Sequence, residues 1–170
     1  MKIDIKNSGC SPLLFWFDSL NIRLLQIILV SITAVVCWQV FSRYVLAEPS
    51  SITEELSRFL LIWLTVLGAA YAYRKRSHLG LDIIYNQGTA LQRKVMYLMI
   101  HMSIALFALC VMVFGGIRLV LMTYELGQKS AVMGIDIGLV YMVLPISGLL
   151  ILIYALNFMF SYAENSEPVL

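Results

Sequence analysis

The only imidazole side chains in this sequence are those of His78 and His101. Two histidines at matching depth on facing helices are the ligands that bis-imidazole haem requires. His101 lies seven residues after Lys94, about 10 Å further along a helix, whereas His78 follows the basic end of the preceding apolar stretch. This difference in depth disfavours haem, and a haem- or quinone-binding anchor of a redox enzyme remains the alternative interpretation. The simpler expectation for His101 is a hydrogen-bonded histidine inside a helix pack.

Charged side chains gather between Ser42 and Asp82, and none lies in the middle of an apolar stretch. An ion-coupled transporter needs ionisable or polar groups near the midplane of the membrane, often beside broken helices. The sequence also lacks the motifs of a nucleophile elbow, a phosphate-binding loop or a cysteine metal site. We therefore expect neither an enzyme nor a bound cofactor, and no complete transport pathway formed by this chain unaided.

The composition indicates a membrane protein. Hydrophobic residues make up 61% and charged residues 13% of the 170 residues, against roughly 45–50% and about 25% in soluble domains. The sequence predicts a single all-α integral membrane domain over residues 1–170, and the net charge of only +2 argues against a nucleic-acid partner. Four apolar stretches are long enough to cross a lipid bilayer, at about 24–46, 54–73, 93–122 and 139–162.

The first span is expected to direct membrane insertion, because residues 1–12 contain no apolar signal-peptide core. Pro12 predicts a helix start, and the aromatic-rich stretch 13–20 either forms a separate interfacial helix or prolongs the first span. The three cysteines are odd in number and are expected to be small packing residues: Cys10, Cys37 and Cys110.

Further local signals set the other helix ends. Ser51 and Glu54 have the spacing of a capping box, which predicts a helix starting near Ile52. A short interfacial helix is expected over residues 79–84, and the fourth span contains Pro145 and Gly148, a pair that can kink a helix. The remaining signals are a second capping-box pair that starts the third helix, Thr89 and Gln92.

The second span is short. Only 15 uncharged residues separate Arg58 from Arg74, about 22 Å of helix against a hydrocarbon core of roughly 30 Å. Glu54, Glu55 and Arg58 are therefore expected at the membrane boundary, where charges must pair, snorkel or be covered by protein. Glu54 and Arg58 have the favourable i,i+4 order, and Arg43 lies across the hairpin. These charges brace the hairpin, face a partner subunit, or do both.

Lysine and arginine counts set the expected orientation. The connection after the second span carries five of these residues and the N-terminal segment three, whereas the two other connections carry two each. Under the positive-inside rule, both termini are then cytoplasmic.

An ordered set of residues resembles the small membrane subunit of tripartite ATP-independent periplasmic (TRAP) transporters, the DctQ type. The set extends from about residue 42 to 150, with two departures: Ile52-Thr53 stands where the family often has Trp, and Ala131-Val132 where it often has a second proline. The matching residues are Ser42-Arg43-Tyr44, Glu54-Glu55-Leu56-Ser57-Arg58, Leu60-Leu61-Ile62-Trp63-Leu64, Gly68-Ala69-Ala70, Arg74, His78, Asp82, Ser130 to Ile135, Val140-Tyr141 and Leu144-Pro145.

The resemblance implies a three-part uptake system in a bacterial inner membrane. A large subunit carries the substrate and Na⁺ sites and moves as an elevator, a periplasmic binding protein delivers an organic acid, and the small subunit enlarges the static scaffold. Sialic acid is the preferred substrate, and C4-dicarboxylates are the second candidate class. The expected interface or hairpin-bracing residues are Arg43, Tyr44, Glu54, Glu55, Arg58 and Trp63, and the residues expected at the cytoplasmic side are Arg74, Lys75, Arg76, His78 and Asp82.

Overall fold

The computed structural model describes residues 12–46, 50–75 and 90–165. Four of its helical stretches are long and apolar enough to cross a membrane, and the described residues contain no strand apart from an isolated bridge between Lys129 and Asp136. The all-α membrane fold is thus confirmed. The elements in chain order are α1 (Pro12–Tyr44), α2 (Ser51–Arg74), α4 (Ala90–Phe107), the π-helix η3 (Ala108–Gly115), α5 (Gly116–Glu125), α6 (Ile137–Tyr141) and α7 (Val143–Asn165).

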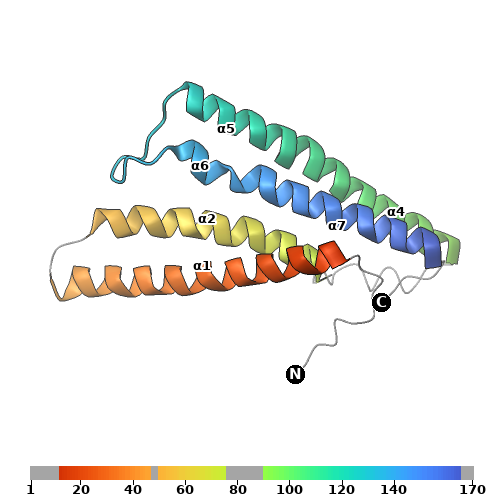
Figure 1. Cartoon of the computed structure of the whole chain (residues 1–170), viewed down its shortest axis with the longest axis horizontal. Coiled ribbons are helices and arrows are strands. Elements are labelled where there is room, and N and C mark those ends of the chain that lie inside the picture. The colour runs from red at the N-terminus through yellow and green to blue at the C-terminus, as the bar shows by residue number, and fades with distance from the viewer. Residues whose placement is uncertain (1–11, 47–49, 76–89, 166–170) are drawn as a thin grey trace.

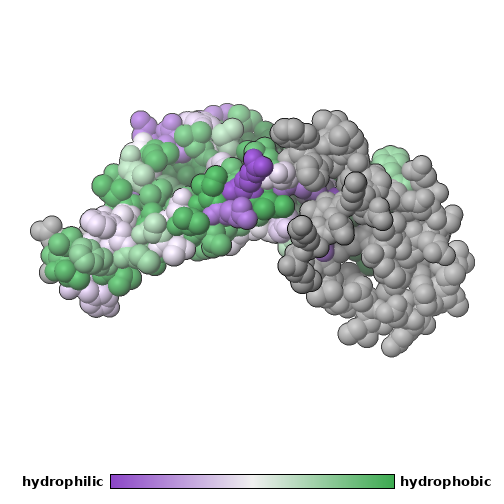
Figure 2. All heavy atoms as spheres, turned by 60° about the horizontal axis from the view of Figure 1, so that its bottom comes forward, coloured by the Kyte–Doolittle hydropathy of each residue, from purple (hydrophilic) through white to green (hydrophobic). Residues whose placement is uncertain are grey.

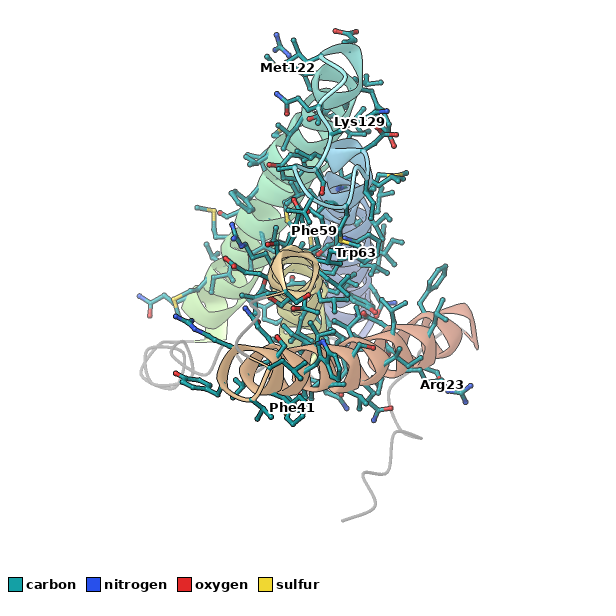
Figure 3. All side chains as sticks on the ribbon, turned by 90° about the vertical axis from the view of Figure 1, so that its left-hand side faces the viewer. Arg23, Phe41, Phe59, Trp63, Met122 and Lys129 are labelled. Carbon is teal, nitrogen blue, oxygen red and sulfur yellow. The ribbon has the colours of Figure 1, made fainter. Side chains whose placement is uncertain are left out.

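The helices form two long antiparallel hairpins that lie side by side (Figure 1). One hairpin pairs α1 with α2, and the other pairs α4, η3 and α5 with α6 and α7. We call the end that carries the 126–136 loop the loop end, and the end where α1 begins and α7 finishes the tail end. Seen along the helices, α2 lies between α1 and the second hairpin (Figure 3).

Two clusters of buried side chains explain the central position of α2. The larger cluster joins α2 to α4, η3 and α7 toward the tail end. The smaller joins α2 to α1 and α7 and consists of Ile28, Leu67 and Val143. The buried members of the larger cluster are Ala70, Tyr73, Ala105, Ala108, Ile151, Tyr154, Ala155 and Phe158.

Most of the outer surface is apolar, as the transmembrane assignment requires. Large side chains such as Val30 and Phe160 are each 70% exposed, and hydrophobic residues cover most of the coloured surface in Figure 2. Contiguous apolar surface of this extent is rare on soluble monomers. Lipid or protein must therefore cover it.

The structure differs from two expectations about helix starts. Helix α1 runs unbroken from Pro12 to Tyr44, so the stretch 13–20 prolongs the first span and the separate interfacial helix is wrong. The start of α2 near Ile52 is confirmed, since the helix begins at Ser51, but the capping box is absent: Ser50 is the N-cap, with no side-chain hydrogen bond. Instead, the Thr53 hydroxyl donates to the Ser50 carbonyl at 2.9 Å. The interfacial helix expected over 79–84 and the cap at Thr89 lie outside the described residues.

The third and fourth spans are less regular than a single helix. The π-helix η3 interrupts the third span between α4 and α5. The break between α6 and α7 falls at Met142, one turn before Pro145, which has no N–H to donate to the Tyr141 carbonyl. The missing proline N–H thus accounts for the interruption between α6 and α7.

A buried hydroxyl links the two hairpins. Ser147 is fully buried and donates its hydroxyl hydrogen bond to the Val66 carbonyl at 2.9 Å. We expect Ser147→Ala to lower the free energy of unfolding in detergent or nanodiscs by about 0.6 kcal/mol, the average for interhelical hydrogen bonds in membranes. The control is Thr65→Ala, because the Thr65 hydroxyl bonds to the Leu61 carbonyl of its own helix. An equal loss for both variants would contradict an interhelical contribution.

Candidate subunit-interaction site

At the loop end, Glu54 and Arg58 form the i,i+4 ion pair that their spacing predicts. Their side chains are 56% and 69% exposed. An ion pair so open to its surroundings contributes little to folding in water, about 0–1 kcal/mol. Both groups therefore point outward and are available to something beyond this chain.

Glu55, the next residue, is used differently. Its Oε2 accepts hydrogen bonds from the backbone N–H groups of Val132 at 3.2 Å and Met133 at 3.0 Å. These donors lie on the loop before α6, 77 and 78 residues further along the chain. The carboxylate thus satisfies two backbone N–H groups of the loop and holds the loop against the first turns of α2.

The loop itself is a compact turn. The Ser130 N–H donates to the Ile135 carbonyl at 2.8 Å, the Ser130 hydroxyl accepts from the Met133 N–H at 3.1 Å, and Ser130 is buried. Gly134 has a φ of +67°, a conformation that favours glycine. Glu55 therefore binds a preorganised turn, and Glu54 is the glutamate left facing outward.

The other residues expected at this site are separated. Arg43 and Tyr44 end α1 on the exposed surface, Tyr44 with 79% of its area exposed. Within the described part of the chain, Arg43 forms no ion pair with Glu54 or Glu55. Trp63 packs against the smaller buried cluster on α2, so its position fits bracing of the helix pack (Figure 3).

A second polar site lies at the tail end. The Arg74 Nε donates to Asp18 Oδ2 at 3.0 Å, and the two side chains are only 17% and 18% exposed. The guanidinium carbon lies 5.6 Å from the ring centroid of Tyr154 and 5.7 Å from that of Phe158, within cation–π range. Arg74 is therefore packed inside the protein, joining α1, α2 and α7.

Sequence reasoning missed Asp18. The sequence did contain a signal for a buried ion pair. Asp18 is the only acidic residue between Pro12 and Leu46, and it stands in a stretch rich in aromatic side chains. Neighbouring Asn21 is also buried, with 5% of its area exposed, and its amide has no hydrogen-bond partner among the described residues. This end of α1 is thus a buried polar region inside an apolar molecule.

Of the other residues expected at the cytoplasmic side, only Lys75 lies within the described part of the chain. Lys75 is exposed, with its ammonium 5.9 Å from the Tyr71 ring centroid, a position that suits a membrane-surface cation. Arg76, His78 and Asp82 lie outside the described residues. Their expected place at the cytoplasmic side stays a prediction.

His101 lies in the helix pack, among aromatic rings. Its ring centroid is 4.2 Å from that of Tyr97 and 5.4 Å from that of Phe158, and its Nδ1 is 3.4 Å from the Tyr73 hydroxyl. Over the described residues, no group of three or more His, Cys, Asp or Glu side chains could hold a metal ion. The surroundings of His101 fit a packing role.

Four apolar spans, charges confined to their ends and an outward ion pair define a multi-span membrane subunit. The chain belongs to the family described as tripartite ATP-independent periplasmic transporters, DctQ component, whose model matches residues 32–165. Proteins of this family are permease subunits and not enzymes, and they are multi-pass proteins of the bacterial inner membrane. They work together with a large permease subunit.

Individual relatives agree with this membership. A TRAP transporter small permease protein of Haemophilus influenzae is 28% identical over 133 residues, 76% of this chain and 81% of that protein. The C4-dicarboxylate TRAP transporter small permease protein of Rhodobacter capsulatus is 29% identical over 67% of this chain and 50% of its own length. The isethionate TRAP transporter permease protein DctMQ of Oleidesulfovibrio alaskensis is 26% identical over 56% of this chain and 15% of its own length. Two further relatives are named as small permease proteins of an ectoine and a sialic acid TRAP transporter.

Proposed function

We propose that this chain is the non-catalytic small subunit of a Na⁺-coupled TRAP transporter that imports an organic acid, and that it acts as a scaffold for the large permease subunit. The observation that carries the proposal is the distribution of charge. No Asp, Glu, Lys or Arg lies in the middle of any span, so the groups that would bind Na⁺ and substrate belong to another subunit. No cofactor is expected in this chain.

The scaffold role is supported by surface that the chain leaves uncovered. The Glu54–Arg58 pair is exposed at the loop end of α2, next to a span too short for a typical bilayer. A protein neighbour at this place would cover charges that otherwise have to snorkel to the membrane surface. In addition, the alignment with DctMQ covers only a small part of that protein, so a segment similar to this chain occurs there within a much larger permease protein.

We further propose that the loop end faces the periplasm and helps to dock the substrate-binding protein, with both termini in the cytoplasm. The positive-inside count supports this orientation. The turn held by Glu55 exposes Ala131 and Val132, Val132 with 47% of its area. A rigid exposed turn is suited to docking because little ordering entropy is lost on binding.

The substrate class is proposed from the relatives. Their names include C4-dicarboxylate, ectoine, sialic acid and isethionate, and sialic acid and C4-dicarboxylates are our preferred candidates. A scaffold subunit is not expected to select among them.

The scaffold proposal is tested by co-purification. We expect this chain, expressed with the large permease subunit of the same transporter, to be recovered in a stable complex by an affinity tag on either subunit. Glu54→Lys reverses the outward carboxylate and is expected to reduce the yield of complex or the rate of uptake. The matched control is Thr65→Ala, an exposed site without charge on the same helix.

Two outcomes would contradict this proposal. The scaffold role fails if the two chains, each well folded, never associate. The role of the loop-end charges fails if transport is unchanged when all of Arg43, Glu54, Glu55 and Arg58 are neutralised together.

A further inference from the structure

The loop-end part of the second hairpin is a distinct unit, which we call the outer hairpin. It comprises α5, the 126–136 loop and α6, that is, residues 116–141. It is connected to the rest of the chain at two places, through η3 and through the break at Met142. Neither connection has the regular α-helical hydrogen-bond pattern: η3 is a π-helix, and Pro145, just after Met142, has no N–H to donate to the Tyr141 carbonyl.

The first connection is the π-helix. Runs of π-helix are rare, and they often mark functional sites. At its end, the Gly116 N–H is shared between the carbonyls of Met112 and Val113, and Gly115 precedes it. Two glycines and a shared hydrogen bond give this joint less resistance to bending than a regular helix has.

The second connection lies directly against the first. Helix α6 ends at Tyr141 and α7 begins at Val143. A Cβ on Gly116 would lie 3.0 Å from Pro145 Cδ and 3.2 Å from Leu144 Cβ. Residues next to the two joints are therefore in close contact, and a rotation at one joint would involve the other.

The outer hairpin is tightly packed within itself. A Cβ on Gly138 would lie 2.7 Å from the Tyr124 ring, so α5 and α6 approach closely. The loop adds hydrogen bonds from Gln128 to the Thr123 carbonyl at 3.2 Å and from Ile137 to the Gln128 carbonyl at 3.1 Å. These contacts favour movement of residues 116–141 as one body.

The polar attachment of the outer hairpin to α2 depends on one residue. Within the described residues, the hydrogen bonds from the outer hairpin to α2 all end on Glu55, among them those from the Val132 and Met133 N–H groups. The Glu55 carboxylate binds the outer hairpin at the end furthest from the joints, where a small rotation at the joints gives the largest displacement. It is therefore placed to hold the unit closed or release it.

We propose that the outer hairpin is a hinged unit that opens and closes relative to α2, with η3 and Met142 as its joints and Glu55 as its latch. Opening separates the exposed turn from the loop end of α2. The loop end of this subunit can therefore change conformation independently of any movement in a partner subunit.

The latch is tested by distance measurement in the full chain in lipid nanodiscs. Spin labels on the exposed positions Leu61 of α2 and Leu121 of α5 report the separation of the two bodies, in a background whose three cysteines are replaced by serine. Glu55→Ala is expected to raise the long-distance population about tenfold or more, since hydrogen bonds to charged groups are worth at least that factor. Glu54→Ala is the matched control and leaves the distances unchanged, because Glu54 pairs within its own helix.

The joints are tested with two adjacent glycines. Gly116→Ala places a methyl group against Pro145 and is expected to shift the Leu61–Leu121 distance even with Glu55 intact. Gly115→Ala is the control, since its Cβ would meet only the Cys110 carbonyl at an ordinary 3.7 Å. Equal effects of the two alanines would overturn the assignment of the joint.

Three further results would overturn the proposal as a whole. The first is an unchanged Leu61–Leu121 distance in Glu55→Ala. The second is faster amide exchange at Val132 and Met133 without that distance change, which means that only the loop frays. The third is an equal shift between labels on Leu61 and Met99 of α4, which means that the entire helix pack has loosened.

Discussion

Replacing Asp18 by alanine is expected to lower the free energy of unfolding by about 3 kcal/mol, because the substitution removes a carboxylate that accepts a hydrogen bond from the largely buried Arg74 guanidinium. Removing one partner of a buried ion pair typically costs about 3–5 kcal/mol. The two side chains are less than one fifth exposed, and the rings of Tyr154 and Phe158 hold the guanidinium in place. Unfolding in detergent or nanodiscs, followed by steric trapping or by SDS titration, measures the loss.

Two comparisons make this result specific. Glu54→Ala removes an exposed pair and is expected to cost less than about 1 kcal/mol. The double variant Asp18→Leu with Arg74→Leu removes both charges and is expected to recover much of the stability, because apolar replacement of a buried pair is often neutral or better. An Asp18→Ala variant as stable as Glu54→Ala would mean that the pair is not buried in the membrane-embedded protein.

Replacing Gly148 by leucine is the second large effect, expected to destabilise the chain by about 3 kcal/mol, the upper part of the usual range for overpacking. A Cβ at Gly148 would lie 2.7 Å from Met112 Cβ and 3.2 Å from the Met112 backbone carbonyl carbon. Because one of these atoms is backbone, relief requires α7 and η3 to move apart. The same unfolding measurement tests this prediction.

Gly68 provides the matched control. It also lies inside a helix, yet a Cβ there would meet nothing within 4 Å. Gly68→Leu is therefore expected to be neutral or stabilising by up to about 1 kcal/mol, from helix propensity alone. Equal destabilisation at the two glycines would show that the close approach of α7 to η3 is absent.

The four spans were predictable from the sequence because their signal is local. Length and hydropathy suffice to recognise a membrane helix, since a bilayer excludes unpaired backbone groups whatever the neighbours are. The Glu54–Arg58 pair was predictable for the same reason: i,i+4 geometry follows from the helix itself. Neither prediction needed any knowledge of how the helices pack.

Features that depend on how the helices pack could not be predicted from the sequence. The pairing of Asp18 with Arg74 joins residues 56 positions apart and requires the register of α1 against α2. Glu54 and Glu55 are neighbours of one type, and only the position of the loop backbone decides which of them is bound. The π-helix left no sequence signal, because η3 is apolar on every side and so shows no periodicity to interrupt.

The neighbouring helices α1 and α2 have a consequence for the bilayer. Between Arg23 and Arg43, α1 offers 19 uncharged residues, about 29 Å, which matches a typical hydrocarbon thickness. Beside it, α2 offers 15, so one membrane thickness cannot suit both helices. Mismatch costs a fraction of a kcal/mol per Å and favours thinning or oligomerisation. Where α2 meets the bilayer, the molecule should therefore gather thin lipid or a protein neighbour, whereas the outer surface of α1 lies in unperturbed bilayer.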